Sequence, residues 1–312
     1  MIRVIFDSHP DLAIPGESHF IPPLLRDRAT YERDAGFDVE RLVAYLVTHD
    51  RFKVWRMPEP VLREALVREP IKDMPDAIRR AFAAHATRKG KSRYADKTPR
   101  YAVRMALIAD AFPEAKFIHV IRDGRDVALS LLEVPWGVKG VGQGALYWKK
   151  RASTARRIGE MLGPERYIEY RHEDLLDDPE EVVRRICDFI ELPYDPTMLR
   201  YYEGRKPSRA SHMQHLVRPP TKGLRDWRQQ MDREDLRFFE LLAGNLLEEL
   251  GYERATDDSS LEPVVEAELR RRARRLRRRG KTLERPADAP LGRGPRAVLR
   301  AVSARVKNNR HR

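Results

Sequence analysis

The stretch KFIHVIRDGRDVALSLL, residues 116–132, runs from an apolar strand-like segment through four charged residues around one glycine into an apolar helix-like segment. Such a turn, at the carboxyl end of a buried strand and the start of a helix, is where α/β proteins bind anionic ligands, because helix amides point outward there. The plainer interpretation is that the charges between Arg122 and Asp126 only solvate the turn and that Gly124 supplies a permissive backbone angle. Other parts of the sequence are needed to distinguish an anion-binding turn from a solvated one.

Three other stretches carry residues suited to chemistry. DSHPDLAIPGESHFIP at 7–22 contains Glu17, whose carboxylate can accept a proton, and His19 is a second possible base in the same loop. DKTPRY at 96–101 contains Lys97, whose ammonium can stabilise developing negative charge. TKGLRDW at 221–227 combines two cations with a glycine and a tryptophan.

Hydrophobic periodicity indicates the elements that must position these stretches. It predicts strands over 116–121 and 167–170, and Pro179 is well placed in the first turn of a helix. Strands that alternate with helices at this spacing indicate an α/β protein with a mainly parallel sheet and helices on both faces. The predicted helices span 2–9, 38–48, 74–87, 100–112, 144–162, 179–190 and 233–250, the last ending at Gly251 as a C-cap.

The charge of the chain is concentrated in its C-terminal part. The 312 residues carry a net charge of +13, and residues 261–312 hold 17 Lys plus Arg against 5 Asp plus Glu, a net of +12, so the remainder carries about +1. The basic segment LRRRARRLRRRGK is typical of a solvated helix or a disordered arm, and it can also contact an anionic surface. The segment lacks aromatic residues for base stacking, which argues against specific nucleic-acid binding.

The composition indicates a globular, cytoplasmic protein. Hydrophobic residues make up 41% of the chain, which is enough for a substantial core. Cys187 is the single cysteine and cannot form an internal disulfide, and the first 20 residues lack the pattern of a secretion signal. No apolar run approaches the roughly 18 residues of a membrane span.

In their order and spacing, the four stretches resemble the sulfotransferases that use 3'-phosphoadenosine 5'-phosphosulfate (PAPS), especially the branch with protein-tyrosine sulfotransferases and many bacterial enzymes. The likeness covers most of residues 1–252. It implies an α/β, three-layer, P-loop-like sulfotransferase fold, with a mainly parallel sheet flanked by helices. We therefore expect a sulfotransferase domain over 1–254, followed by a linker and a basic tail over 255–312.

The resemblance also implies how the donor is bound. An arginine on the strand-to-helix turn and a serine eight residues later bind the 3'-phosphate in that family, and Arg122 and Ser130 stand at those positions. A guanidinium and a hydroxyl near a helix N-terminus suit a dianionic phosphate. His172 replaces the family's tyrosine that approaches the adenine, although a histidine after a strand is at least as often structural.

The late donor loop of the family resembles TKGLRDW, although this match is looser. The likeness implies that Lys222, Gly223 and Arg225 approach the 3'-phosphate and that Trp227 anchors the segment. Together with the strand-to-helix turn, this loop would complete the part of the site that binds the bisphosphate.

Two residues match the family's catalytic positions. Glu17 falls where related enzymes place the glutamate that accepts the acceptor's proton, and its loop favours it over His19. An unperturbed glutamate titrates at about 4.3, so useful basicity needs burial or a nearby negative charge. Lys97 resembles the lysine that faces the transferring sulfuryl group and the bridging oxygen. The plainer alternatives are that Glu17 caps a helix or is simply exposed, and that Lys97 belongs to a solvated helix entry.

The family begins with a strand and a glycine-bearing loop of the type PRSGTT that wraps the 5'-phosphosulfate. Here Met1 falls where the helix after that loop is already under way, so the first strand and phosphate loop are missing. GVKGVGQG at 137–144 has the wrong spacing to replace that loop. We expect a truncated or misassigned start and impaired catalysis as given, which the encoding DNA upstream of Met1 would test.

These observations lead to an enzyme that moves a sulfuryl group from PAPS to a hydroxyl-type acceptor on a small molecule, glycan, lipid or peptide. No metal is expected, because the one close histidine pair, His212 and His215, has no further ligand at suitable spacing. Two other classes stay open: a non-catalytic nucleotide-binding or regulatory descendant of the family, and an interaction protein acting through its basic tail. The acceptor itself and the oligomeric state do not follow from these residues.

Overall fold

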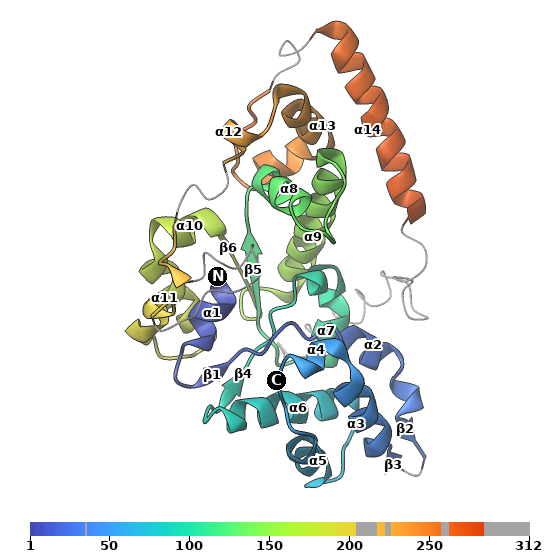
Figure 1. Ribbon diagram of the computed structural model, residues 1–312, viewed down its shortest axis with the longest axis vertical. Coiled ribbons are helices and arrows are strands. Elements are labelled where there is room, and N and C mark those ends of the chain that lie inside the picture. Colours follow the sequence, from blue (N-terminus) through green and yellow to red (C-terminus); the bar gives the residue numbers. More distant parts are fainter. Residues whose placement is uncertain (35, 204–216, 222–225, 257–261, 284–312) are drawn as a thin grey trace. The chain divides into compact units, whose positions relative to one another are not determined.

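A computed structural model describes residues 1–34, 36–203, 217–221, 226–256 and 262–283 of the chain (Figure 1). These residues form two compact units. The first contains Met1–Ala115 and Cys187–Pro219, and the second contains Lys116–Ile186 and the described residues from Pro220 onward. Each unit is described by itself.

The first unit is mainly helical, with short strands between the helices. Its elements are α1 (Ile2–Asp7), β1 (Leu12–Ala13), α2 (Ile21–Arg26), η1 (Arg28–Thr30), β2 (Glu32–Arg33), β3 (Gly36–Phe37), α3 (Val39–Thr48), α4 (Asp50–Lys53), α5 (Glu59–Val67), α6 (Met74–Arg88), β4 (Arg93–Tyr94), η2 (Pro99–Arg104), α7 (Met105–Ala111) and η3 (Pro196–Arg200).

In the second unit, strands and helices alternate as far as β6, and the described elements after it are helices. Its elements are β5 (Phe117–Ile121), α8 (Gly124–Leu132), α9 (Val141–Leu162), β6 (Tyr167–Arg171), α10 (His172–Asp177), α12 (Trp227–Gln230), α13 (Arg233–Glu249) and α14 (Pro263–Leu283). Helix α11 (Pro179–Phe189) spans the boundary in sequence between the two units.

Aspartate side chains start several of the helices. The carboxylates of Asp38, Asp73 and Asp232 accept the backbone N–H three residues later at the first turns of α3, α6 and α13. This satisfies one of the amide groups that a helix start leaves without a partner. At the other end of α13, Gly251 adopts a φ of 76°, as the C-cap prediction requires.

Parallel strand pairing is confirmed in both units. Strand β1 pairs in parallel with β4, and β5 pairs in parallel with β6 over five residues. The strands of the described residues form separate two-stranded pairs, and the α/β class with mainly parallel pairing is confirmed. The short antiparallel pair of β2 and β3 was not predicted, because two residues are too few for a periodic signal.

Most predicted helices are confirmed, with two differences. The helix expected over 100–112 is a 3₁₀ segment, η2, followed by a shorter α-helix, α7. Hydrophobic spacing does not distinguish these two tight helices over one turn, and η2 starts with Pro99. Helix α9 also starts three residues earlier than predicted, at Val141.

Aromatic and aliphatic side chains form a separate core in each unit. In the first unit, Trp55 packs with Phe82 at a ring-centroid distance of 4.6 Å and with Phe20 at 5.3 Å. In the second unit, α8, α9 and α13 surround buried side chains that include Trp148 and Phe239. These cores hold the loops that carry the candidate site residues.

The basic segment expected as a helix or an arm is helical over α14, which packs against α13 and α9 (Figure 1). None of the helices in the described ranges combines the length and apolar character needed to cross a lipid bilayer.

Candidate active site

The first candidate site lies at the carboxyl end of the β1–β4 pair. Because the two strands are parallel, the loops that follow them leave at the same end. The loop after β1 carries Glu17 and His19, and the loop after β4 carries Lys97. Strand pairing therefore brings together residues that are 80 positions apart in sequence.

Hydrogen bonds on both sides hold the Glu17 loop in place. The indole Nε1–H of Trp55 donates to the carbonyl of Gly16 at 2.8 Å, and the amide of Ser18 donates to Thr98 Oγ1 at 3.1 Å. The hydroxyls of Ser18 and Tyr101 lie 2.8 Å apart, and Ser18 is fully buried. Glu17 is thus fixed between two anchored neighbours.

Glu17 and Lys97 form a close ion pair within this loop arrangement. Lys97 Nζ donates to Glu17 Oε1 at 2.6 Å, and His19 Nε2 lies 3.0 Å from the other carboxylate oxygen. His19 has a φ of 56°, which places its ring back against the carboxylate two residues earlier. All three residues were predicted as candidates from the sequence, but their contact in one cluster was not predicted.

Two features of the surroundings of Glu17 have opposite effects on its pKa. Partial burial raises the pKa of Glu17, but the hydrogen bonds and positive charges of Lys97 and His19 outweigh burial and leave the pKa below its ordinary value. The carboxylate is therefore held ionised. The Lys97 ammonium and the hydrogen bond with His19 also make it a weak proton acceptor as long as both stay in contact with it.

The second candidate site lies at the carboxyl end of the β5–β6 pair. Ile121 and Arg171 are partners in register, so the next residue of each strand, Arg122 and His172, enters its loop at the same sheet edge. The two predicted donor-binding residues are brought to one end of the parallel pair. His172 is the first residue of α10 and is partly buried.

Arg122 precedes the N-cap of α8, whereas Asp126 and Ser130 lie within the helix, four residues apart. The guanidinium of Arg122 lies 3.5 Å from the Asp126 carboxylate, and Ser130 is one turn further along on the same side. Burial raises the pKa of Asp126, and the charge of Arg122 opposes this effect. Asp126 is thus the residue that contacts Arg122 from the first turn of α8, and Ser130 follows it one turn later.

Two of the charges in the RDGRD turn are buried, so the interpretation that all four solvate the turn is wrong for this pair. Arg125 is 1% exposed and forms two hydrogen bonds to Asp123, at 3.0 and 2.8 Å. Its third nitrogen contacts Glu240 at 3.0 Å, and its plane stacks on Trp227 at 3.7 Å. These contacts tie α8 to α13 and to the start of α12.

Trp227 occupies the anchoring position expected for it. It is buried, its amide donates to Asp126 at 2.9 Å, and its indole donates to Asp123 at 3.0 Å. Lys222, Gly223 and Arg225, predicted in the same loop, lie outside the described residues. Trp227 therefore holds the start of α12 against the start of α8.

The role of Gly124 differs from the turn interpretation. Its φ is not in the left-handed region, and a Cβ there would come within 2.4 Å of the Trp148 ring and 2.7 Å of the Phe239 ring. Glycine is needed for close packing of the helix start rather than for a special backbone angle. The Trp148 indole also donates to the carbonyl of Arg122 at 3.0 Å, which fixes the preceding peptide.

A polar cleft of about 370 Å³ adjoins the start of α8. Glu173, which was not predicted as a site residue, lines this cleft and accepts the amide of Asp123 at 3.0 Å and the hydroxyl of Tyr252 at 2.8 Å. A carboxylate that follows a strand was the available signal. Arg122, Ser130 and His172 are not among the described residues that line this cleft, which are Asp123, Arg125, Asp126, Arg171, Glu173, Trp227, Arg228, Gly251, Tyr252 and Glu253.

Known proteins share this sequence pattern. Residues 1–196 match the model of the sulfotransferase family. A Caenorhabditis briggsae protein, provisionally named a protein-tyrosine sulfotransferase, is 26% identical over 276 residues, which cover 84% of this chain and 86% of the relative. The omega-hydroxy-beta-dihydromenaquinone-9 sulfotransferase Stf3 of Mycobacterium tuberculosis is 26% identical over 186 residues, 54% of this chain and 44% of that protein.

Among solved structures, the sulfotransferase domain from the curacin biosynthetic pathway aligns with a TM-score of 0.48 and 17% identity, covering 80% of this chain and 92% of that one. The match of residues 1–196 to the family model extends over more than half of the 312 residues. On that ground, the chain belongs to the sulfotransferase family.

Proposed function

We propose that this protein transfers a sulfuryl group from PAPS to a hydroxyl group of an acceptor. The observation that carries the proposal is the ion pair of Glu17 and Lys97 at 2.6 Å, held at the carboxyl end of a parallel strand pair. A carboxylate beside an ammonium supplies a proton acceptor and an electrostatic stabiliser, the two functions that sulfuryl transfer needs from side chains.

In the proposed reaction, the acceptor oxygen attacks sulfur in line with the bond from sulfur to the bridging oxygen. A new sulfur–oxygen bond forms, the bond to the bridging oxygen breaks, and adenosine 3',5'-bisphosphate leaves with the negative charge. Glu17 takes the proton of the acceptor hydroxyl, and Lys97 stabilises the charge that develops on the leaving phosphate. The products are a sulfate ester and the bisphosphate.

The resting contact between Glu17 and Lys97 suggests how donor binding prepares the base. The anionic phosphosulfate competes with Glu17 for the Lys97 ammonium, and Lys97 moves toward the donor. Without the Lys97 ammonium in contact, burial has the larger effect on the Glu17 carboxylate, so the pKa of Glu17 rises. Glu17 thus becomes a better base when the donor is present.

Arg122, Ser130 and His172 are proposed to bind the bisphosphate part of the donor. Arg122 is partly exposed and engages Asp126 in a single 3.5 Å ion pair, which costs little to exchange for a phosphate. His172 enters from the same sheet edge and is assigned to the adenine. Lys222, Gly223 and Arg225 are assigned to the 3'-phosphate on the basis of their family positions.

The acceptor class follows from the relatives only in general terms. Their names refer to protein tyrosine and to a hydroxylated menaquinone derivative, so a phenol and an alcohol are both reasonable acceptors for this chain. We propose a hydroxyl acceptor without a narrower choice. A screen of tyrosine peptides and hydroxylated lipids with labelled PAPS addresses it.

Calorimetry with adenosine 3',5'-bisphosphate tests the donor site directly. We expect micromolar binding, and Arg122→Ala should weaken it at least about tenfold because a charge-assisted phosphate contact is lost. Arg157→Ala, an exposed arginine on α9, is the matched control and should leave affinity unchanged. Absence of binding to the folded chain would refute the donor site, whereas binding without transfer would favour a nucleotide-binding protein.

A further inference from the structure

One side of helix α14 is buried, and this determines which of its side chains face solvent. Leu269 and Ala273 are 2% and 3% exposed and lie in the core of the second unit. The buried guanidinium of Arg237 on α13 forms a bidentate ion pair with Glu266, at 2.8 and 2.6 Å. The apolar side of this helix is therefore used within the protein and is not available for insertion into a membrane.

The outward side of α14 is strongly cationic. The helix contains eight arginines and one lysine against two glutamates. One arginine pairs with Glu266 and another with Glu268, which leaves the excess positive. The exposed cations among the described side chains of α14 are Arg270, Arg271, Arg272, Arg274, Arg275 and Arg278.

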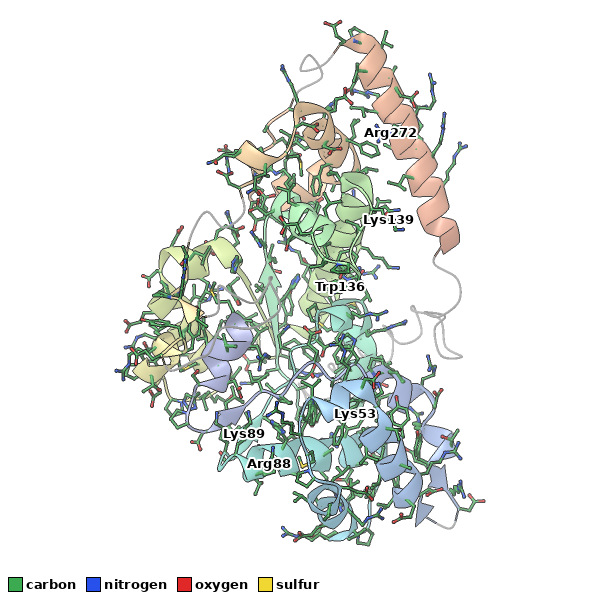
Figure 2. The ribbon with its side chains drawn as sticks, viewed as in Figure 1. Lys53, Arg88, Lys89, Trp136, Lys139 and Arg272 are labelled. Carbon is green, nitrogen blue, oxygen red and sulfur yellow. The ribbon has the colours of Figure 1, made fainter. Side chains whose placement is uncertain are left out.

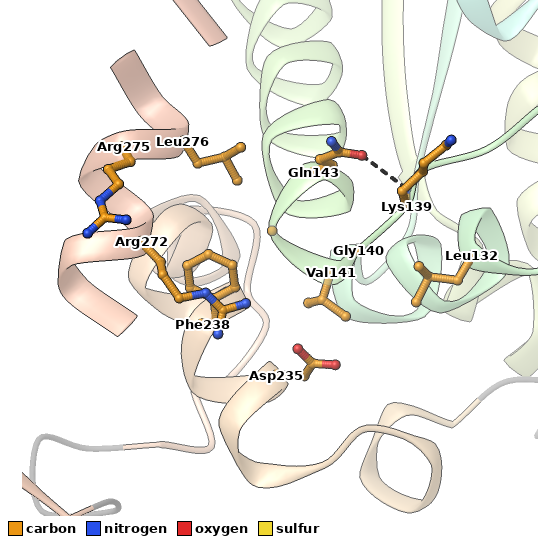
Figure 3. Close-up of a pocket in the computed structure, with 11 residues that line it drawn as sticks. Leu132, Lys139, Gly140, Val141, Gln143, Asp235, Phe238, Arg272, Arg275 and Leu276 are labelled. Atoms are coloured by element: carbon orange, nitrogen blue, oxygen red, sulfur yellow. Dashed lines mark hydrogen bonds between the residues drawn. The ribbon is translucent and has the colours of Figure 1, made fainter. Parts of the chain in front are cut away.

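A cleft of about 430 Å³ lies between α14, α13 and the segment that leads into α9 (Figure 3). Its apolar lining includes Leu132, Val141, Phe238 and Leu276, and its cations are Lys139, Arg272 and Arg275. Arg272 lies 4.7 Å from the centroid of the Phe238 ring. Asp235 is the one acidic residue among the described lining side chains.

An exposed tryptophan stands beside this cleft. Trp136 is 70% exposed, whereas Trp55, Trp148 and Trp227 are at most 5% exposed. It belongs to the loop between Leu132 and Lys139, both of which line the cleft. Figure 2 shows Trp136, Lys139 and Arg272 along one side of the second unit.

The loop holds Trp136 outward by a tight turn. The amide of Gly137 donates to the carbonyl of Val134 at 2.9 Å, and the amide of Val138 donates to the carbonyl of Leu131 at 3.2 Å. A Cβ at Gly137 would lie 1.7 Å from the Leu131 oxygen, so only glycine allows this turn. A large aromatic side chain is thus presented to solvent by a sterically defined backbone.

We propose that this surface docks the protein onto an anionic lipid bilayer. The Trp136 face is defined by Leu132, Trp136, Lys139, Arg272 and Arg275. Tryptophan prefers the bilayer interface, where its ring contacts acyl chains and its N–H stays hydrated, and arginines attract anionic headgroups. Leu132, 39% exposed, adds apolar contact beside it.

The same features argue against a nucleic acid as the partner. Single-stranded nucleic acids are bound by successive aromatic side chains on which bases stack. The Trp136 face has one exposed aromatic side chain and one exposed aliphatic side chain, Leu132, and three cations line the cleft that Leu132 also lines. This combination suits an interface with an apolar interior and a charged surface. Membrane docking is independent of sulfuryl transfer and is tested without it.

The first test uses the full chain with vesicles of phosphatidylcholine, either pure or containing one quarter phosphatidylglycerol. Co-sedimentation should show binding to the anionic vesicles, weak binding to the neutral ones, and loss in about 1 M salt, where the Debye length is about 3 Å. Because the other three tryptophans are buried, lipids brominated in the acyl chain should quench Trp136 specifically.

Substitutions then locate the surface. Arg272→Glu/Arg275→Glu should weaken vesicle binding at least about tenfold, and Trp136→Ala should weaken it roughly fivefold and remove the quenching. Arg51→Glu/Arg68→Glu on the first unit has the same net charge change and should alter binding less than about twofold. Circular dichroism and the thermal midpoint show whether each variant is folded.

Three results would overturn the proposal. They are equal binding to neutral vesicles, equal weakening by the control pair, and unquenched Trp136 on bound vesicles. Stronger binding to a single-stranded oligonucleotide than to anionic vesicles, without a contribution from Trp136, would identify a nucleic-acid surface instead.

Discussion

Glu17 Oε1 lies 2.6 Å from Lys97 Nζ because the residues that follow them are also bonded, the Ser18 amide donating to Thr98 Oγ1 at 3.1 Å. A buried hydrogen bond and a partly exposed ion pair therefore both contribute to joining the two loops. The buried bond sets the distance between the backbones, and the ion pair sets the charge state of the carboxylate. Each contact leads to a separate prediction.

Removing the carboxylate should abolish the proposed base without affecting the donor site. We expect Glu17→Gln to lower kcat for sulfuryl transfer roughly 10²-fold or more, since general bases contribute about that much. Calorimetry should show an unchanged affinity for adenosine 3',5'-bisphosphate. Glu64→Gln, on the exposed side of α5, is the control. A Glu17→Gln enzyme with a normal kcat would exclude Glu17 as the base.

Replacing the lysine should change how Glu17 titrates. In the native chain its pKa is lowered, so Glu17 contributes stability that is fully present above its ordinary pKa, and this contribution is lost as the pH falls through the lowered value. Lys97→Met leaves burial and His19, so the pKa of Glu17 should rise and the loss should begin at a higher pH. Carbon-detected NMR titration of the Glu17 carboxyl measures the shift.

The ion pair of Glu17 and Lys97 should contribute little to the free energy of unfolding. Both side chains of the pair are about one third exposed, and such pairs are worth at most about 1 kcal/mol after screening. An unchanged titration of Glu17 in Lys97→Met would show that the ion pair does not control the carboxylate.

The hydroxyl of Thr98 should act as a positioning group. Thr98→Val leaves the buried Ser18 amide without its acceptor, which costs about 1–3 kcal/mol in the free energy of unfolding. It should also loosen the Glu17 loop, lower kcat and move the acid limb of the pH profile. Thr98→Ser keeps the hydroxyl and should restore all three. Loss of stability with an unchanged pH profile would mean a purely structural role.

Arg122 and Arg125 stand three residues apart on the same turn, but replacing them should lower the free energy of unfolding by very different amounts. Arg125→Met removes the buried cation that pairs with the carboxylates of Asp123 and Glu240 and should cost about 3–5 kcal/mol. Arg122→Met removes one partly exposed ion pair and should cost less than about 1 kcal/mol. Urea titration measures both. Similar losses for the two variants would contradict the assignment of Arg125 as the structural residue.

The sequence by itself determined the family and most of the helices. Helix limits follow from local signals such as an aspartate cap, a proline in the first turn or Gly251 at a helix end, and these act within a few residues. The order of the four stretches identified the family before any contact was known, and the match of residues 1–196 confirms it. The same stretches named Glu17, Lys97 and Arg122 as candidates.

Tertiary structure alone decided which of these residues meet and which charges are buried. The pairing of Glu17 with Lys97 depends on the register of β1 and β4, which lie about 80 residues apart and are too short to leave a periodic pattern. The burial of Arg125 depends on α13, which contributes Glu240 from 115 residues away. Composition showed a basic tail, but only packing could show which side of α14 is covered, because burial depends on contacts with distant elements.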